Sequence, residues 1–236
     1  MAKITAFRAR HLVATRLASS LSHIPALRPW LVRRFISDLQ DLNDALRNTE
    51  LEGYYWVWSG LLLGWAREGA VLPHDCLDAD FGVADCDFYR LVRAVPAIVR
   101  AGFRCDRRFI SSTGQVTELT FIRHGARFEF FRMFPVDGRL HYYMFNIRLK
   151  GITEVEASLP EQQMVPFLFV GRTWLKPKDH ELELRSVYGS WELPDPSWSY
   201  LDTLGIEARR VSPHSHFDWR DGAVALPEGS HKQSAG

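Results

Sequence analysis

One short segment constrains the fold of this chain more than any other, because its residues alternate between apolar and polar positions. The order is Leu77, Asp78, Ala79, Asp80, Phe81, Gly82 and Val83. A period of two is typical of a β-strand, whose successive side chains point to opposite faces of the sheet. The sequence therefore predicts a strand with one apolar face and one face that carries two neighbouring carboxylates.

Two carboxylates on one strand face can converge on a cation. Hard divalent ions such as Mg²⁺ take oxygen ligands, often one or two carboxylates together with substrate phosphates. A third acid, Glu129, lies within the otherwise apolar segment 127–131, where an acid is costly unless it is paired or binds a metal. We therefore expect Asp78, Asp80 and Glu129 to be catalytic residues that hold Mg²⁺ or Mn²⁺. The alternative is a solvated strand face.

A turn upstream of this strand offers a place for a phosphate. Ser59 and Gly60 form a turn signal before the apolar residues that follow, and Ser59 is placed as a possible N-cap of a helix. Backbone N–H groups at a helix start can bind phosphate, and Arg67 on that helix adds positive charge. We predict that Ser59, Gly60, Arg67 and Asp75 bind substrate. Such turns are common, so this signal alone is weak.

The remaining pattern predicts an α/β (α+β) protein with a mixed sheet and flanking helices. Helices are expected at 31–46, 61–68, 87–99 and 177–188, the last with Pro177 in its first turn and Gly189 as its cap. Strands are expected at 54–58, 77–83, 103–110, 116–122, 127–134 and 141–147. We divide the chain into a basic N-terminal extension (1–30), a folded domain (31–205) and an irregular C-terminal tail (206–236).

Charge and composition restrict the setting in which the chain works. The formal net charge is +1, so no global field favours nucleic acid as a partner. Three cysteines without metal-ligand spacing fit a reducing compartment, and no apolar run is long enough to cross a membrane. We expect a cytoplasmic protein.

The N-terminal stretch is basic and carries no Asp or Glu before Asp38. This leaves three interpretations open: an amphipathic helix on the domain surface, peripheral contact with a membrane, or a transit peptide.

Four segments, which keep the family's order along the chain, resemble the LicD and fukutin family. The block Ser59–Asp75 resembles its Gly-Thr-Leu-Leu-Gly signature, and residues 78–83 resemble its Asp-x-Asp strand. Residues 188–194 are similar to its Tyr-Gly-x-x-Trp-x-x-Pro element, and 127–131 resemble the strand of the third acid. The resemblance covers about residues 35–200. Asp78, Asp80 and Glu129 fall on the family's metal residues.

The resemblance implies a polymerase-β-like nucleotidyltransferase fold. It also implies a phosphotransferase that moves a phospho-alcohol, such as ribitol phosphate or phosphocholine, from a CDP-linked donor to a glycan or glycolipid. Two alternatives stay open. The chain could transfer a nucleoside monophosphate to a small molecule or protein, or it could be a non-catalytic nucleotide-binding module. His74 stands where the family usually has Trp, which motivates the last alternative.

Overall fold

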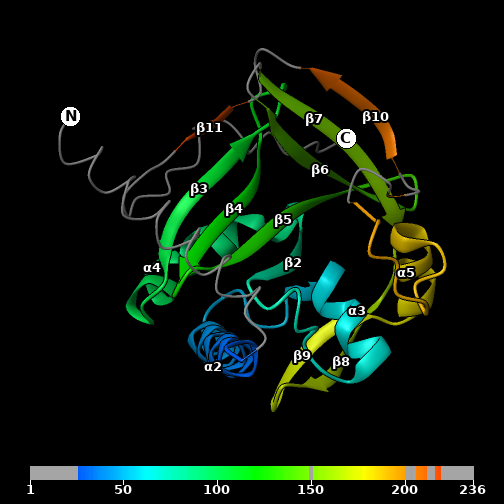
Figure 1. Cartoon of the computed structure of the whole chain (residues 1–236). Coiled ribbons are helices and arrows are strands. Elements are labelled where there is room, and N and C mark those ends of the chain that lie inside the picture. The colour runs from blue at the N-terminus through cyan, green and yellow to red at the C-terminus, as the bar shows by residue number, and fades with distance from the viewer. Residues whose placement is uncertain (1–25, 149–150, 200–202, 204–205, 212–215, 219–236) are drawn as a thin grey trace.

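A computed structural model describes residues 26–148, 151–199, 203, 206–211 and 216–218. In this part the chain forms a mixed α/β (α+β) structure, in which helices flank a mixed sheet (Figure 1). The fold class expected from the sequence is confirmed at this level. None of the helices in the described ranges combines the length and the apolar character that a membrane crossing requires.

The main sheet has nine strands and a branch. Its main path runs, in spatial order, through β10 (Ile206–Val211), β7 (Gly151–Pro160), β6 (Arg139–Arg148), β5 (Ala126–Val136), β4 (Val116–Arg123), β3 (Arg104–Ile110) and β11 (His216–Asp218). Off this path, β2 (Asp78–Ala84) pairs with β5 in parallel, and β1 (Tyr55–Trp58) pairs antiparallel with β2. A separate hairpin is formed by β8 (Met164–Phe169) and β9 (Arg172–Pro177).

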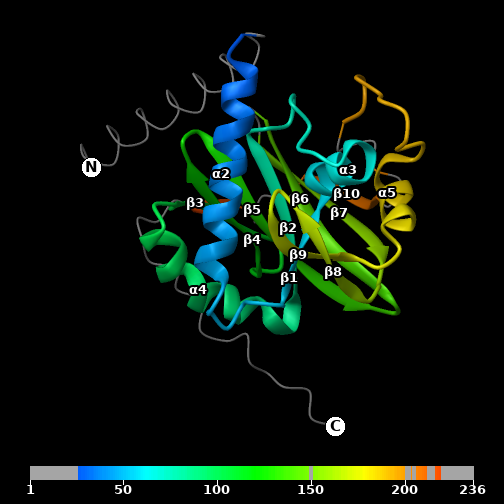
Figure 2. The ribbon, with the colours of Figure 1, turned by 90° about the horizontal axis from the view of Figure 1, so that it is seen from below.

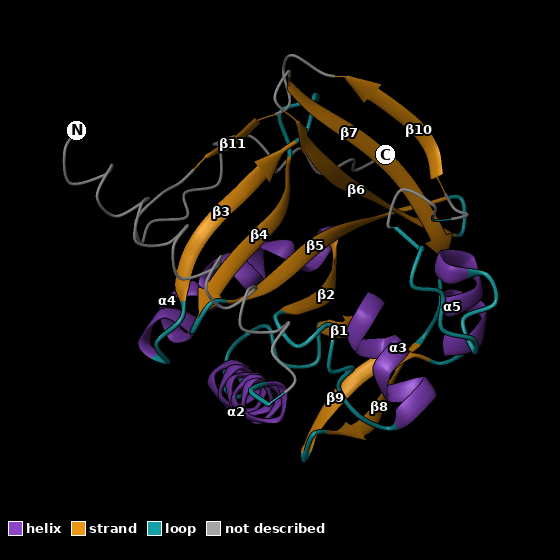
Figure 3. Cartoon of the chain, in the orientation of Figure 1, coloured by secondary structure: helices purple, strands orange, loops and turns teal. Residues whose placement is uncertain are grey.

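Strand β5 joins the two halves of the sheet. Residues 126–131 pair with β4, and residues 127–133 pair with β2 on the other side. Its last three residues, 134–136, pair with β6 instead. The sheet curves strongly along this path, as Figure 3 shows. β5 is therefore the strand on which the placement of β2 depends.

Within the described ranges, four α-helices flank the sheet: α2 (Arg28–Leu46), α3 (Ser59–Glu68), α4 (Phe88–Arg100) and α5 (His180–Tyr188). A short 3₁₀ turn, Asp85–Asp87, leads into α4. Helices α2 and α4 lie on one side of the strands around β2, and Figure 2 shows this arrangement from below. Helices α3 and α5 contact each other, and α5 also contacts β7.

The apolar face of β2 is held in the core, as its pattern predicts. Ala79, Phe81 and Val83 are fully buried and belong to one hydrophobic cluster with Phe35 of α2 and Phe130 of β5. Phe81 stacks on Phe130 with ring centroids 4.9 Å apart. Because this face is buried, Asp78 and Asp80 must point to the opposite side of the strand.

Several expectations from the sequence need correction. Pro177 does not begin a helix but ends β9, and α5 begins at His180 with Asp179 as its cap, whose side chain accepts a hydrogen bond from the N–H of Leu182. Strands β7 and β9 were not expected at all.

The expected division of the chain also changes at both ends. Residues 206–211 and 216–218 are strands rather than irregular tail, and α2 begins before the expected boundary at residue 31. Residues 1–25 and most of the expected tail lie outside the described residues.

Candidate metal and phosphate site

Two neighbouring parallel strands bring the three predicted metal residues together. In the register of β2 with β5, Asp80 lies opposite Glu129, and Asp78 lies opposite Arg127. One carboxylate oxygen from each of Asp78, Asp80 and Glu129 lies within 4.8 Å of the others. Glu129, 49 residues after Asp80 in the sequence, thus joins the two aspartates in one cluster with the ligand chemistry of a divalent cation.

Two arginines share the cluster with the acids. Arg127 Nη2 donates to Asp78 Oδ2 at 2.7 Å, and Arg107 Nη2 donates to Glu129 Oε1 at 2.8 Å. The other oxygen of Asp78, Oδ1, is buried and has no hydrogen-bond partner among the described residues. A buried carboxylate oxygen without a partner is expensive, and a cation would supply the missing interaction. The donor set therefore fits Mg²⁺ or Mn²⁺.

Burial raises the pKa values of the two aspartates in the cluster. It raises the pKa of Asp78 to about 8, with Glu129 adding to the rise and Arg127 opposing it. Burial also raises the pKa of Asp80 well above its ordinary value, helped by the charges of Asp78 and Glu129. These carboxyls therefore hold protons near neutral pH unless a cation neutralises them. A bound divalent ion would compete directly with those protons.

Sequence reasoning missed a fourth acid beside the cluster. Glu118 on β4 is 3% exposed, accepts a 2.6 Å hydrogen bond from Thr120 Oγ1 and lies 4.0 Å from Arg107 Nε. Burial and the charge of Glu129 raise its pKa to about 8. The signal was the same as for Glu129, an acid inside a strand of otherwise buried residues.

The turn between β1 and α3 holds Ser59 in a role that differs from the expected one. Ser59 is the first residue of α3, and the N-cap position before it belongs to Trp58. Its φ of 54° lies in the left-handed region, which is unfavourable for a residue with a side chain. Its hydroxyl lies 3.2 Å from the Tyr188 hydroxyl. Burial raises the pKa of Asp80, and the interaction of that carboxyl with the Ser59 side chain partly opposes the rise. Ser59 thus faces Tyr188 and Asp80 and is not the N-cap of α3.

Gly60 and Asp75 are in direct contact. A Cβ atom built on Gly60 would lie 1.9 Å from Asp75 Oδ2, so any larger residue would displace the carboxyl. Burial raises the pKa of Asp75 to about 7, while Arg127 opposes the rise. The start of α3, where we expected a phosphate, therefore already faces an acidic side chain.

A cavity of about 560 Å³ opens beside these residues. It is lined by three of the four predicted substrate-binding residues and by aromatic side chains, namely Gly60, Arg67, Asp75, Tyr188, Trp191 and Trp198. Arg67 Nε is buried and has no hydrogen-bond partner among the described residues. Tyr188 connects the cavity to the carboxylates through its contact with Ser59. A guanidinium with a free donor and several aromatic faces suit a phosphorylated ligand with a planar ring.

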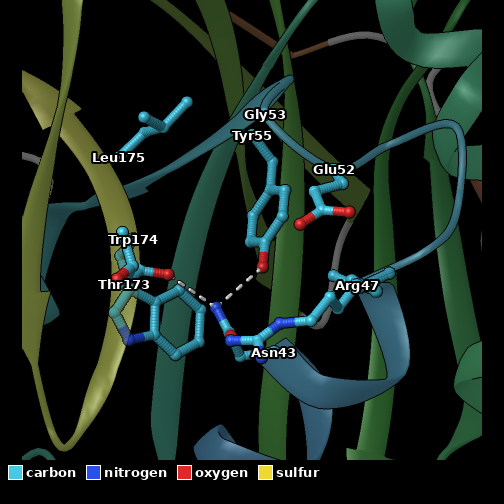
Figure 4. Close-up of a pocket in the computed structure, with 9 residues that line it drawn as sticks. Asn43, Arg47, Glu52, Gly53, Tyr55, Thr173, Trp174 and Leu175 are labelled. Atoms are coloured by element: carbon cyan, nitrogen blue, oxygen red, sulfur yellow. Dashed lines mark hydrogen bonds between the residues drawn. The ribbon is translucent and has the colours of Figure 1, made fainter.

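Two other polar groupings do not adjoin this site. A cavity of about 200 Å³ lies between α2, β1 and β9, where Asn43 Nδ2 donates to the Tyr55 hydroxyl (3.2 Å) and to the carbonyl of Thr173 (3.0 Å), as Figure 4 shows. It shares no lining residue with the site, and Asn43 there ties the helix to the strands.

The second grouping joins His141, Glu156 and Glu207 on β6, β7 and β10. Arg139 lies 3.9 Å from Glu207, and His141 lies 3.6 Å from Glu156 and 3.3 Å from Glu207. These contacts connect side chains of β6, β7 and β10.

The fold and the cluster together define a mixed α/β protein with a carboxylate site suited to a divalent cation, next to a cavity with a free arginine donor. Comparison with family models, with curated proteins and with solved structures finds no match to this chain. Its function is therefore argued from the site itself.

Proposed function

We propose that this protein is a metal-dependent transferase of the LicD and fukutin type. It would move a phospho-alcohol, such as ribitol phosphate or phosphocholine, from a CDP-linked donor to a glycan or glycolipid acceptor. The proposal includes a polymerase-β-like nucleotidyltransferase fold for the domain. The observation that carries it is the convergence of Asp78, Asp80 and Glu129 within 4.8 Å, on adjacent parallel strands.

Within this proposal the three carboxylates have different roles. Asp78 and Asp80 would hold the cation against the donor diphosphate, and the buried Oδ1 of Asp78, which has no hydrogen-bond partner among the described residues, would be a ligand atom for it. When bound, Mg²⁺ supplies Lewis-acid stabilisation of charge on the phosphoryl oxygens. Glu129 would hold a second cation near the acceptor or take the proton of the acceptor hydroxyl.

The transfer itself is a displacement at phosphorus. The acceptor oxygen forms a bond to the phosphorus that bears the alcohol, and the bond from that phosphorus to the CMP oxygen breaks. The hydroxyl proton passes to a carboxylate, and CMP leaves with the bonding electrons. Such reactions depend mainly on positioning and electrostatics. Arg67 would bind a donor phosphate from the wall of the cavity.

Product analysis distinguishes this proposal from its alternatives. We would incubate the full chain and Mg²⁺ with CDP-ribitol, CDP-choline, CDP-glycerol or a nucleoside triphosphate, with and without glycan acceptors. Release of CMP supports the proposal. Release of pyrophosphate from a triphosphate supports transfer of a nucleoside monophosphate instead. Tight nucleotide binding without either product supports a non-catalytic binding module.

A matched pair of variants ties the activity to the cluster. Asp80→Asn should lower turnover more than about 100-fold, because losing even a partner that only orients a metal ligand costs 10–100-fold. Asp137→Asn removes an acid from the exposed β5–β6 turn and should leave turnover unchanged. Equal activity of the two variants would remove the basis for the assignment.

A further inference from the structure

A third cavity, of about 360 Å³, lies along the first half of α2, away from the carboxylates. It is lined by five residues of α2, by the last residue of β4 and by the residue that follows it, namely Trp30, Arg33, Arg34, Ser37, Asp38, Arg123 and His124. It shares no lining residue with the proposed catalytic site. Three guanidinium groups and an imidazole thus surround a hollow that contains a single acid.

That acid is already engaged by its neighbours. Asp38 is 2% exposed, and its carboxylate lies 2.9 Å from His124 Nδ1 and 3.3 Å from Arg123 Nε. His124 adopts a φ of 50°, so the β4–β5 turn holds a non-glycine residue in the left-handed region where its ring meets Asp38. The single carboxylate of the cavity therefore does not neutralise the remaining arginines.

Positive charge remains free at the mouth of the cavity. Arg33 and Arg34 are exposed, and within the described ranges neither forms an ion pair with an acid. Arg123 Nη2 binds Asp41 at 2.8 Å, but Arg123 Nη1 is buried without a hydrogen-bond partner among the described residues. Guanidinium donors that lack a partner and share one hollow suit a phosphate group, which accepts several hydrogen bonds at once.

Apolar side chains flank the same hollow. Trp30 is 49% exposed and Leu27 is 37% exposed, on the first turn of α2 and just before it. The Arg34 guanidinium lies 5.6 Å from the centre of the Trp30 ring. The sequence before α2 adds cations and no acid. Tryptophan beside arginine is typical of the headgroup level of a bilayer, where the ring lies among the lipids and the cations meet phosphate.

We propose that this cavity binds the phosphate of an anionic phospholipid and thereby places the start of α2 against a membrane surface. Charge complementarity selects an anionic lipid, and the exposed Trp30 and Leu27 select a lipid surface over a free phosphate. The proposal does not depend on the transferase activity.

Vesicle sedimentation of the full chain tests this site. Vesicles of phosphatidylcholine with and without phosphatidylglycerol would be compared, for the native chain and for Arg33→Gln/Arg34→Gln. Both arginines are exposed on α2, so the fold should be retained. Each cation at an anionic surface contributes roughly five-fold to binding, so the double variant should bind phosphatidylglycerol vesicles about 30-fold more weakly. Trp30→Ala should also weaken binding.

The matched control is Arg93→Gln/Arg100→Gln, which removes the same charge from exposed positions on α4. This control should bind like the native chain. Equal losses in both double variants would mean that net charge alone drives binding and would overturn the proposal. Calorimetry with inorganic phosphate completes the test. If the chain binds inorganic phosphate saturably but does not bind phosphatidylglycerol vesicles, the cavity is a site for free phosphate. That result would contradict the lipid assignment.

Discussion

At the scale of single residues, the most informative groups are buried acids with too few partners. Asp78 carries a buried oxygen that finds no hydrogen-bond partner in the described part of the chain, and burial raises the pKa values of Asp78, Asp80 and Asp75 together. Like charges that share a small volume destabilise the folded state unless protons or cations neutralise them. Such an arrangement lowers the stability of the folded state, and it is typical of sites that bind a charged ligand.

The raised pKa values predict how stability depends on pH. A carboxyl whose pKa is higher in the folded state binds its proton more tightly there, so stability is full below the unfolded pKa near 4. It declines as pH rises through the folded pKa, near 8 for Asp78. Without divalent ions, the free energy of unfolding should fall between about pH 4 and pH 8. Asp80→Asn should reduce this fall. Urea unfolding at several pH values measures it, and a native chain that grows more stable toward pH 8 would contradict the pKa directions.

Glu183 offers a second prediction at this scale, away from the metal cluster. It is 1% exposed on α5, its Oε1 has no hydrogen-bond partner among the described residues, and burial raises its pKa to about 8. Glu183→Gln keeps the volume and removes the ionisation, so it should stabilise the protein at pH 9 by less than about 5 kcal/mol and change little at pH 5. Glu181→Gln, on the exposed side of the same helix, is the control. Equal thermal melts for both variants at pH 9 would refute the expectation.

At the scale of elements, β2 depends on a close approach between strands. Gly82 lies opposite Trp56 of β1, and a Cβ atom on Gly82 would come within 2.3 Å of the Trp56 ring. The glycine lets the indole lie flat across the strand that carries Asp78 and Asp80. The strand's position therefore depends on a residue that has no role in the chemistry.

Gly82→Ala should therefore lower the free energy of unfolding by about 1–3 kcal/mol through overpacking. Combining it with Trp56→Leu should cost less than the sum of the two single changes, because the smaller side chain makes room for the methyl group. Chemical denaturation of the two single variants and the double variant measures this coupling. Additive effects would show that the ring and the glycine do not contact each other.

The elements also show what sequence patterns can and cannot predict. The strand at 78–84 was predictable because one face is buried and the other is not. In strand β7, Val155, Ala157 and Leu159 are buried on one face, but Glu154 and Ser158 are buried on the other face as well. Partners of its two acids, Ser112 for Glu154 and His141 for Glu156, are distant in sequence. Contacts between residues so far apart in the sequence cannot be predicted from a local pattern of apolar and polar residues.

The predictions for Pro177 and Ser59 were wrong for a related reason. Pro177 fits a first helical turn by its φ angle, yet it also fits the end of an edge strand, and the pairing of β9 with β8 decides between them. Ser59 has the residue type of an N-cap, but the tertiary partners Tyr188 and Asp80 use its hydroxyl. The alternation of residues 77–83 predicted that Asp78 and Asp80 share one strand face, whereas the pairing of β2 with β5 brings Glu129 to them. Arg107, Arg127 and Glu118 joined the site through strand register alone.

At the scale of the whole molecule, β5 connects the strands that carry the clustered acids with the rest of the sheet. One side of β5 carries β2 with its two aspartates, the other carries β4 with Glu118, and its end leads to β6. The carboxylates belong to strands, whereas the arginine and the aromatic side chains of the cavity belong to α3, α5 and the segment after it. A site divided in this way can bind a cation on the rigid sheet and a larger ligand between the helices.

The proposed divalent cation site of Asp78, Asp80 and Glu129 is tested most directly by a Mn²⁺ titration followed by electron paramagnetic resonance. The native chain and the Asp137→Asn control should bind Mn²⁺ saturably, more tightly at pH 8 than at pH 5, because protons compete for the same carboxylates. Asp80→Asn should lose that binding while remaining folded by circular dichroism. Binding that is equal in all three proteins, or absent from the native chain at pH 8, would contradict this proposal.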